Sequence, residues 1–107
     1  MSRVKEIFEK IERKILEKKG ELGDTKALIQ FNISGPEGGK WVVDLKDGSM
    51  GVREGDEEAN CTFSATDDNF VKLIKREMKP EMAIMTGKVK LTGDVMLAMK
   101  LAGLFKQ

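Results

Sequence analysis

Histidine is absent from this chain of 107 residues, and cysteine occurs once. Without histidine the chain cannot form a Ser-His-Asp or Cys-His catalytic arrangement or a histidine-rich metal site, and a lone cysteine cannot form an internal disulfide. No apolar run approaches the ~20 residues that span a bilayer, and the first residues do not lead into the apolar region of a signal peptide. The lack of histidine therefore excludes most hydrolytic and zinc chemistry. The lack of a long apolar run leads us to expect a soluble, cytoplasmic protein.

Charge is balanced overall but unevenly distributed along the chain. Nineteen basic and 18 acidic residues give a net charge of +1, which does not favour nucleic acid as the partner. Residues 1–20 carry a net charge of +3, residues 21–71 a net charge of −7 and residues 72–107 a net charge of +5. Most basic residues between Lys72 and Lys106 are expected to form a solvated face; the alternative is that Lys72, Lys75, Arg76 and Lys79 bring the protein into transient contact with anionic membrane surfaces.

Hydrophobic periodicity predicts helices at both ends of the chain. An amphipathic helix over residues 3–19, capped by Ser2, is indicated by apolar residues that recur every three or four positions. A second helix is predicted to begin after the cap Thr66, and a short third helix at Pro80. A final helical segment runs from Val95 to Phe105.

Between these helices the period changes to two, which is typical of half-buried strands. Strands are predicted over residues 27–34, 41–45, 50–54 and 60–65, separated by turn residues, and a fifth strand around Val89 and Leu91. We expect the first four strands to form an antiparallel meander. Length and element order together predict one α+β domain over residues 1–107.

The last segment, from Val95 to Phe105, is apolar almost all the way round, and Lys100 is its only charged residue. A helix on the surface of a soluble protein normally has a polar face. In so short a chain the core is too thin to surround a terminal helix, so its outer side is expected to meet a ligand, a partner chain or a membrane. The alternative is an ordinary core helix.

Methionine is concentrated in the same part of the chain. Five methionines fall between residues 78 and 99, at positions 78, 82, 85, 96 and 99. Their flexible, polarizable side chains suit a cavity or a surface that adapts to variable apolar shapes, although methionine also fills gaps in ordinary cores. The pattern favours an adaptable apolar site.

Candidate catalytic residues are few. Asp67 and Asp68 stand where a helix begins, and capping together with the helix dipole explains both carboxylates. Cys61 alternates with polar residues in a predicted strand and is expected to be a small core residue. We therefore predict no catalytic residue, no metal and no cofactor.

Several segments, in order and at matching spacing, resemble the sterol carrier protein-2 domain family, over about residues 4–101. The most specific are GKWVVDLKDG (39–48), ANCT (59–62) with DDNF (67–70), KP (79–80), GKVKLTGD (87–94) and LAMKL (97–101). The resemblance implies a five-stranded, mostly antiparallel sheet covered by helices, with an apolar tunnel between them. It also implies non-enzymatic binding and transfer of fatty acids, fatty acyl-CoA, sterols or phospholipids.

The resemblance further assigns residues to the lipid site by position. Family members often have two aromatic residues and a glutamine where this chain has Ile84, Met85 and Thr86, and this difference bears on cavity width. With the two apolar residues that end the last helix, the predicted lipid-binding residues are Trp41, Phe70, Ile74, Met82, Ile84, Met85, Thr86, Val95, Met96, Met99, Leu101, Leu104 and Phe105.

Two further expectations concern context. Peroxisomal members end in a Ser-Lys-Leu-like tripeptide, whereas this chain ends Phe105-Lys106-Gln107, so we expect either a free-standing cytosolic protein or one domain of a longer polypeptide. The alternative function is a protein-interaction or dimerisation module that buries Leu101, Leu104 and Phe105, either alone or as an accessory domain of a lipid-metabolising enzyme. For the lipid carrier itself we expect a monomer.

Overall fold

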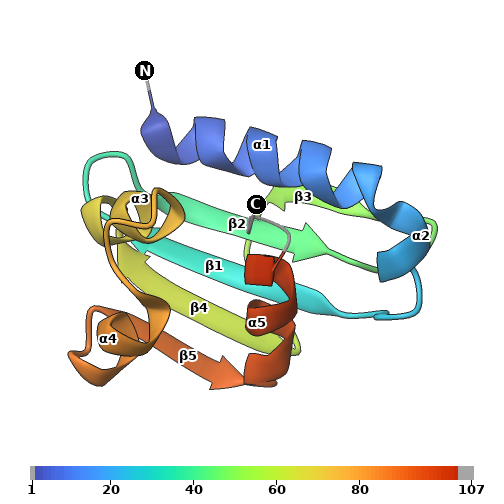
Figure 1. Cartoon of the computed structure of the whole chain (residues 1–107). Helices are drawn as coiled ribbons and strands as arrows, with labels where there is room; N and C mark the ends of the chain where they lie inside the picture. Colours follow the sequence, from blue (N-terminus) through green and yellow to red (C-terminus); the bar gives the residue numbers. More distant parts are fainter. Residues whose placement is uncertain (1, 104–107) are drawn as a thin grey trace.

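Helices cover one face of a five-stranded sheet in the computed structural model, which describes residues 2–103 (Figure 1). The helical and strand content confirms the predicted α+β class. In chain order the elements are α1 (Arg3–Glu17), α2 (Lys19–Leu22), β1 (Leu28–Ser34), β2 (Gly39–Asp44), β3 (Gly51–Glu54), β4 (Cys61–Thr66), α3 (Asp67–Ile74), α4 (Pro80–Met85), β5 (Val89–Gly93) and α5 (Val95–Gly103).

The strands follow the order β3-β2-β1-β4-β5. Three neighbouring pairs are antiparallel, as predicted, and the pair β1–β4 is parallel. The predicted meander is therefore wrong for the fourth strand, which lies beside β1 instead of beside β3. A period of two identifies a strand and its buried face, but it does not identify the neighbouring strand.

The segment 55–60 brings the chain from β3 to β4 across the face of the sheet that the helices leave open. Gln30, a buried residue of β1, holds this segment. Its Oε1 accepts the Glu57 N–H at 2.8 Å, and its Nε2 donates to the Gly55 carbonyl at 3.0 Å. At the far end, the Asn60 Oδ1 accepts the Leu28 N–H at 3.0 Å. These bonds hold segment 55–60, which we call the acidic loop, against the sheet.

Four helices begin where the sequence predicts, whereas α2 was not predicted, because the first helix was expected to run to residue 19. The Ser2 hydroxyl accepts the Lys5 N–H at 3.1 Å at the start of α1, and the Thr66 hydroxyl accepts the Asn69 N–H at 3.2 Å at the start of α3. Each bond satisfies one of the N–H groups that a helix leaves without a partner in its first turn. Pro80 occupies the first turn of α4, where its missing N–H costs nothing.

A cluster of aromatic rings holds α1 and α3 on the sheet. The Phe8 ring of α1 stacks on Trp41 of β2 with 4.5 Å between ring centres. It also lies 5.2 Å from the rings of Phe31 in β1 and Phe70 in α3. Phe63 of β4 completes the cluster, 5.0 Å from Phe31. Because all five rings are buried, they join two helices to three strands.

Asp67 is also structural. Its carboxylate accepts the Glu37 N–H at 2.9 Å and the Asp68 N–H at 2.8 Å, which ties the turn between β1 and β2 to the start of α3. Gly35 stands in this turn with a φ of +102°, and a Cβ there would lie 2.5 Å from the Asp67 carboxylate. The turn therefore requires glycine at this position.

On the open face, Asp44 is a buried carboxylate with two donors. The Lys46 N–H donates to Oδ1 at 2.8 Å and the Arg53 guanidinium to Oδ2 at 2.9 Å. Burial by itself raises the pKa of Asp44, but these hydrogen bonds to the charged form outweigh burial and hold the pKa below its ordinary value. The carboxylate is therefore charged at neutral pH.

Removing the Phe8 ring is expected to destabilise the fold strongly. Phe8→Ala leaves a cavity among three other rings and should lower the free energy of unfolding by about 3–5 kcal/mol in urea melts followed by circular dichroism. Leu16 on the same helix is 46% exposed, so Leu16→Ala should stay within about 0.5 kcal/mol of the unmodified protein. Equal effects of the two substitutions would contradict the packing described here.

The Asp44 carboxylate should make stability depend on acid. Its pKa is lower in the folded than in the unfolded chain, so its stabilisation is full above the unfolded value of about 3.9 and disappears as pH falls through the folded value. Asp44→Asn should lower the free energy of unfolding by about 1–3 kcal/mol at pH 7, with the deficit shrinking below about pH 4. The exposed neighbour Asp47, changed to Asn, is the matched control. The two variants should show different pH profiles in urea melts, and identical profiles would refute the assignment.

Candidate functional site

Exposed large apolar side chains are concentrated on the two helices that flank β5. Of the exposed large apolar residues within 2–103, only Leu16 lies elsewhere, on α1. Met85 of α4 is 80% exposed and Met96 of α5 is 69% exposed. The full set on these two helices is Met82, Ile84, Met85, Val95, Met96 and Met99. We call it the methionine face.

Both helices are short and are held by few buried side chains. In α4, which packs on β5, only Ala83 is buried. In α5, which packs on β4, only Leu97 and Leu101 are buried. Figure 1 shows α4 and α5 at opposite ends of β5, on the same side of the sheet as α1. The sheet is therefore covered less fully at β5 than beneath α1.

A second group of apolar residues in this part of the fold is half-buried. Leu73 and Ile74 in α3, Met78 in the following segment, Leu91 in β5 and Ala98 in α5 all pack against the core and keep some exposure. They contribute apolar surface between the buried core and the methionine face. The arrangement offers an apolar ligand a hydrophobic surface without a fixed polar contact.

The structure distributes the predicted lipid-binding residues over two regions. Those of α4 and α5 form the methionine face, together with Thr86, whose hydroxyl donates to the Met82 carbonyl at 2.7 Å. Phe70 and Leu101 are buried, and Ile74 is half-buried. Leu104 and Phe105 lie outside the described residues.

Trp41 lies apart from the methionine face. It is 5% exposed on β2, beneath α1, where its ring stacks on Phe8. With Phe8 and Val52 it borders a small cavity of about 220 Å³ between α1 and β3. Two strands, β1 and β4, separate its strand from β5.

The site region contains no activated nucleophile among the described residues. Cys61 is 1% exposed, and burial raises the pKa of its thiol, to which the nearby Asp94 charge adds. The thiol is therefore protonated at neutral pH. Within residues 2–103, no three His, Cys, Asp or Glu side chains are grouped to bind a metal, and no helix has the length and apolar character that a membrane span needs.

The sequence did not predict the larger cavity, of about 670 Å³, on the open face of the sheet. Its lining includes Asn32, Ser64 and Lys90, and none of the predicted lipid-binding residues. The polar positions of the alternating strands indicated a solvated face. The concavity depends on strand order and twist, which the alternation does not specify.

Known proteins are similar to this one over most of the chain. The model of the SCP-2 sterol transfer family matches residues 8–106. Hydroxysteroid dehydrogenase-like protein 2 of Bos taurus is 42% identical over 85 residues, which are 78% of this chain and 20% of that protein. Sterol carrier protein 2 of Homo sapiens is 39% identical over 104 residues, 92% of this chain and 19% of that protein. The chain thus spans about one fifth of the length of these relatives.

Solved structures share the fold. Sterol carrier protein 2 from Yarrowia lipolytica, in its apo form, is 28% identical with a TM-score of 0.76, over 94% of this chain and 87% of that chain. The sterol carrier protein domain 2 of Helicoverpa armigera is 30% identical with a TM-score of 0.76, over 94% and 83%. Palmitated sterol carrier protein 2 like 2 from Aedes aegypti is 26% identical with a TM-score of 0.62, over 88% and 93%.

The family model covers almost the whole chain, and the sheet and helices agree with those of the solved relatives. Both findings confirm the resemblance drawn from the sequence motifs. This chain belongs to the SCP-2 sterol transfer family.

Proposed function

We propose that this domain binds lipids and transfers them between membranes or proteins, without catalysing a reaction. The observation that carries the proposal is the methionine face, with six large apolar side chains exposed on α4 and α5 in a member of the SCP-2 sterol transfer family. Large apolar side chains left exposed on two helices that flank one strand favour a binding site for a ligand, a partner or a membrane. The palmitated Aedes aegypti relative supports a lipid as the occupant.

The bound acyl chain or sterol lies between β4–β5 and the helices α3, α4 and α5. Ile74, Phe70 and Leu101 form the inner wall of this tunnel, and the methionine face closes it from outside. Because only Leu97 and Leu101 are buried in α5, the helix can move as a cover at modest cost. Trp41 packs against Phe8 beneath α1 and supports the sheet there, outside the tunnel.

Affinity then comes mainly from burial of apolar surface, at roughly 0.8 kcal/mol per CH₂ before the cost of ordering the chain. This force has no direction, and methionine side chains adapt to the shape of the ligand. Broad specificity follows, so fatty acids, fatty acyl-CoA, sterols and phospholipids are all ligands of the same tunnel. The monomeric state and the cytoplasmic location remain predictions.

A second candidate is favoured by the length comparison. Because the chain spans about one fifth of hydroxysteroid dehydrogenase-like protein 2, the same domain can act within a longer enzyme. There the methionine face would pack against, or pass lipid to, another domain. A domain of this kind still binds lipid itself, which separates the candidate from a pure dimerisation module.

Charge on the methionine face should weaken lipid binding without unfolding the protein. In titrations with a fluorescent fatty acid, Met85→Glu and Met99→Glu should each raise the dissociation constant at least tenfold, since a carboxylate in an apolar contact costs more than 1.4 kcal/mol. Leu16→Glu on α1 is the matched control, because Leu16 is similarly exposed to Met99, at 46% and 49%. Native mass spectrometry of the purified protein should show one lipid per chain.

The free energy of unfolding of each variant shows whether a loss of lipid binding results from a loss of folding. All three variants should keep the free energy of unfolding within about 0.5 kcal/mol, because the altered side chains are exposed. An unmodified protein that takes up no acyl chain, with a mass that rises with concentration, would instead establish the interaction module.

Transfer between anionic vesicles should slow as salt is added. Lys72, Lys75 and Lys79 are exposed on α3 and the segment after it, and salt screens their attraction to anionic head groups. Changing the three lysines to Gln should lower the transfer rate from phosphatidylserine vesicles severalfold at low salt and leave it unchanged from phosphatidylcholine vesicles. A rate insensitive to salt and to these substitutions would remove the membrane step from the proposal.

A further inference from the structure

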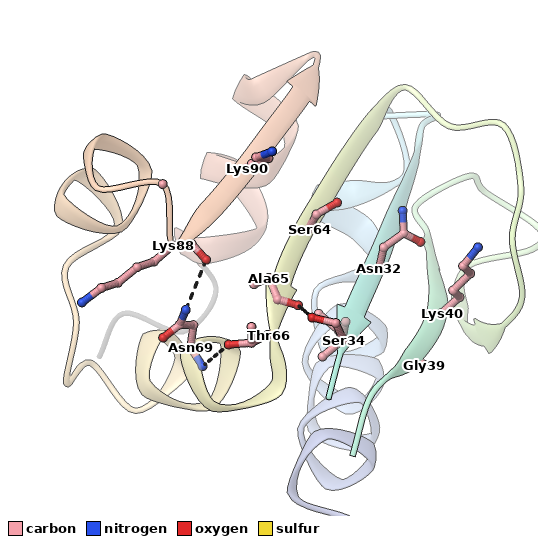
Figure 2. A pocket seen from close by; sticks show the side chains of 12 residues that line it. Asn32, Ser34, Gly39, Lys40, Ser64, Ala65, Thr66, Asn69, Lys88 and Lys90 are labelled. Carbon is pink, nitrogen blue, oxygen red and sulfur yellow. Dashed lines mark hydrogen bonds between the residues drawn. The ribbon is translucent and has the colours of Figure 1, made fainter. Parts of the chain in front are cut away.

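The open face of the sheet has a concave site of its own. The cavity of about 670 Å³ is lined by residues of β1, β2, β4, β5 and α3 and of the segment before β5 (Figure 2). This volume falls in the range of small-molecule sites. Helix α3 borders both this cavity and the lipid tunnel proposed above, but the strand side chains considered next lie on the face opposite the tunnel.

Strand register places four polar side chains in one row across this cavity. Lys40 of β2 pairs with Asn32 of β1, Asn32 with Ser64 of β4, and Ser64 with Lys90 of β5. Neighbouring strands lie ~4.8 Å apart, so the four Cα positions span roughly 14 Å. Figure 2 shows these four side chains on the same side of the sheet. The row has an ammonium group at each end and two neutral polar groups between them.

The row has unused donors and no acid. Within residues 2–103, the Lys90 ammonium, the Ser64 hydroxyl and the Asn32 Nδ2 have no hydrogen-bond or ion-pair partner. The Asn32 Oδ1 already accepts from Gln30 at 3.3 Å, which leaves the amide N–H groups as its available atoms. None of the residues lining the cavity is acidic. Apart from Asp56, which pairs with Lys40, the row therefore offers mainly positive charge and hydrogen-bond donors.

The same face already binds an anionic segment of the chain. Lys40 Nζ pairs with Asp56 of the acidic loop at 2.9 Å, and both side chains are more than half exposed. So exposed an ion pair contributes little to stability, and Lys40 can exchange Asp56 for another anion. Lys90, at the other end of the row, forms no ion pair within residues 2–103.

We propose that this row binds the phosphoryl group of a small anionic molecule. Lys40 and Lys90 supply charge from both ends, while Asn32 Nδ2 and the Ser64 hydroxyl donate hydrogen bonds to its oxygens. A phosphoryl group fits better than a carboxylate because it has more acceptor oxygens and carries up to two negative charges at neutral pH. The proposal is independent of the lipid tunnel, since it uses the other face of the sheet.

The test is a titration of the ¹⁵N-labelled protein with inorganic pyrophosphate, followed by NMR. Saturable shifts should be confined to the row and its neighbours. Lys90→Gln and Ser64→Ala should each raise the dissociation constant about five- to tenfold. Lys10→Gln on α1, on the other side of the sheet, removes the same charge and should leave pyrophosphate binding unchanged. Fatty acid affinity should be the same in all of these variants.

Two further arms identify the source of the phosphoryl group. The first arm compares sedimentation of the protein with phosphatidic acid vesicles and with phosphatidylcholine vesicles. If the protein sediments with phosphatidic acid only, and Lys90→Gln abolishes this while Lys10→Gln does not, the phosphoryl group belongs to a lipid head group. Pyrophosphate binding without such sedimentation would assign it to a soluble molecule. No saturable shift at about 10 mM pyrophosphate, or shifts reproduced by sodium chloride at equal ionic strength, would overturn the proposal. Binding of an acidic peptide but not of pyrophosphate would overturn it as well.

Discussion

The layer of helices on the sheet depends on one contact, the packing of the Phe8 ring against Trp41, Phe31 and Phe70. It joins the longest helix, α1, to two central strands and to α3. The five buried aromatic rings all belong to this cluster. Their concentration under α1 and α3 makes that half of the layer dense and leaves the β5 half with smaller residues.

That asymmetry divides the domain into a fixed half and an adaptable half. Over β5, α4 has one buried side chain, Ala83, and α5 has two. The exposed methionines there have flexible side chains that tolerate different contacts, so bound lipid can complete a core that the chain itself leaves thin. In the proposed carrier, ligand binding and the packing of α5 are one process, because the lipid supplies the contacts that the helix otherwise lacks.

Local features of the fold followed from the sequence, and long-range ones did not. The alternation of Phe31 and Ile33 with polar residues, and the caps Ser2 and Thr66, predicted strands and helix starts that the structure confirms. The position of β4 beside β1 was missed because it depends on Gln30 and the loop that crosses the open face. Periodicity does not record a contact between residues that lie 27 positions apart in the chain.

The candidate sites divide in the same way. The concentration of methionine and the all-round apolar helix predicted an apolar surface at α4 and α5, since exposure there follows from composition. The row from Lys40 to Lys90 was not predictable, because its members come from four strands and meet only through register. The location of Trp41 beneath α1 likewise depends on its ring contact with Phe8.

The central claim, that lipid lies between β5 and the helices α3 to α5, is tested most directly by NMR of the methionine methyl groups during a palmitate titration. Met50, half-buried just before β3, is an internal control outside the site. The account predicts that the methyl signals of Met78, Met82, Met85, Met96 and Met99 shift with one common one-to-one isotherm while Met50 stays in place. Saturable binding that moves Met50 and leaves those five unchanged would contradict it.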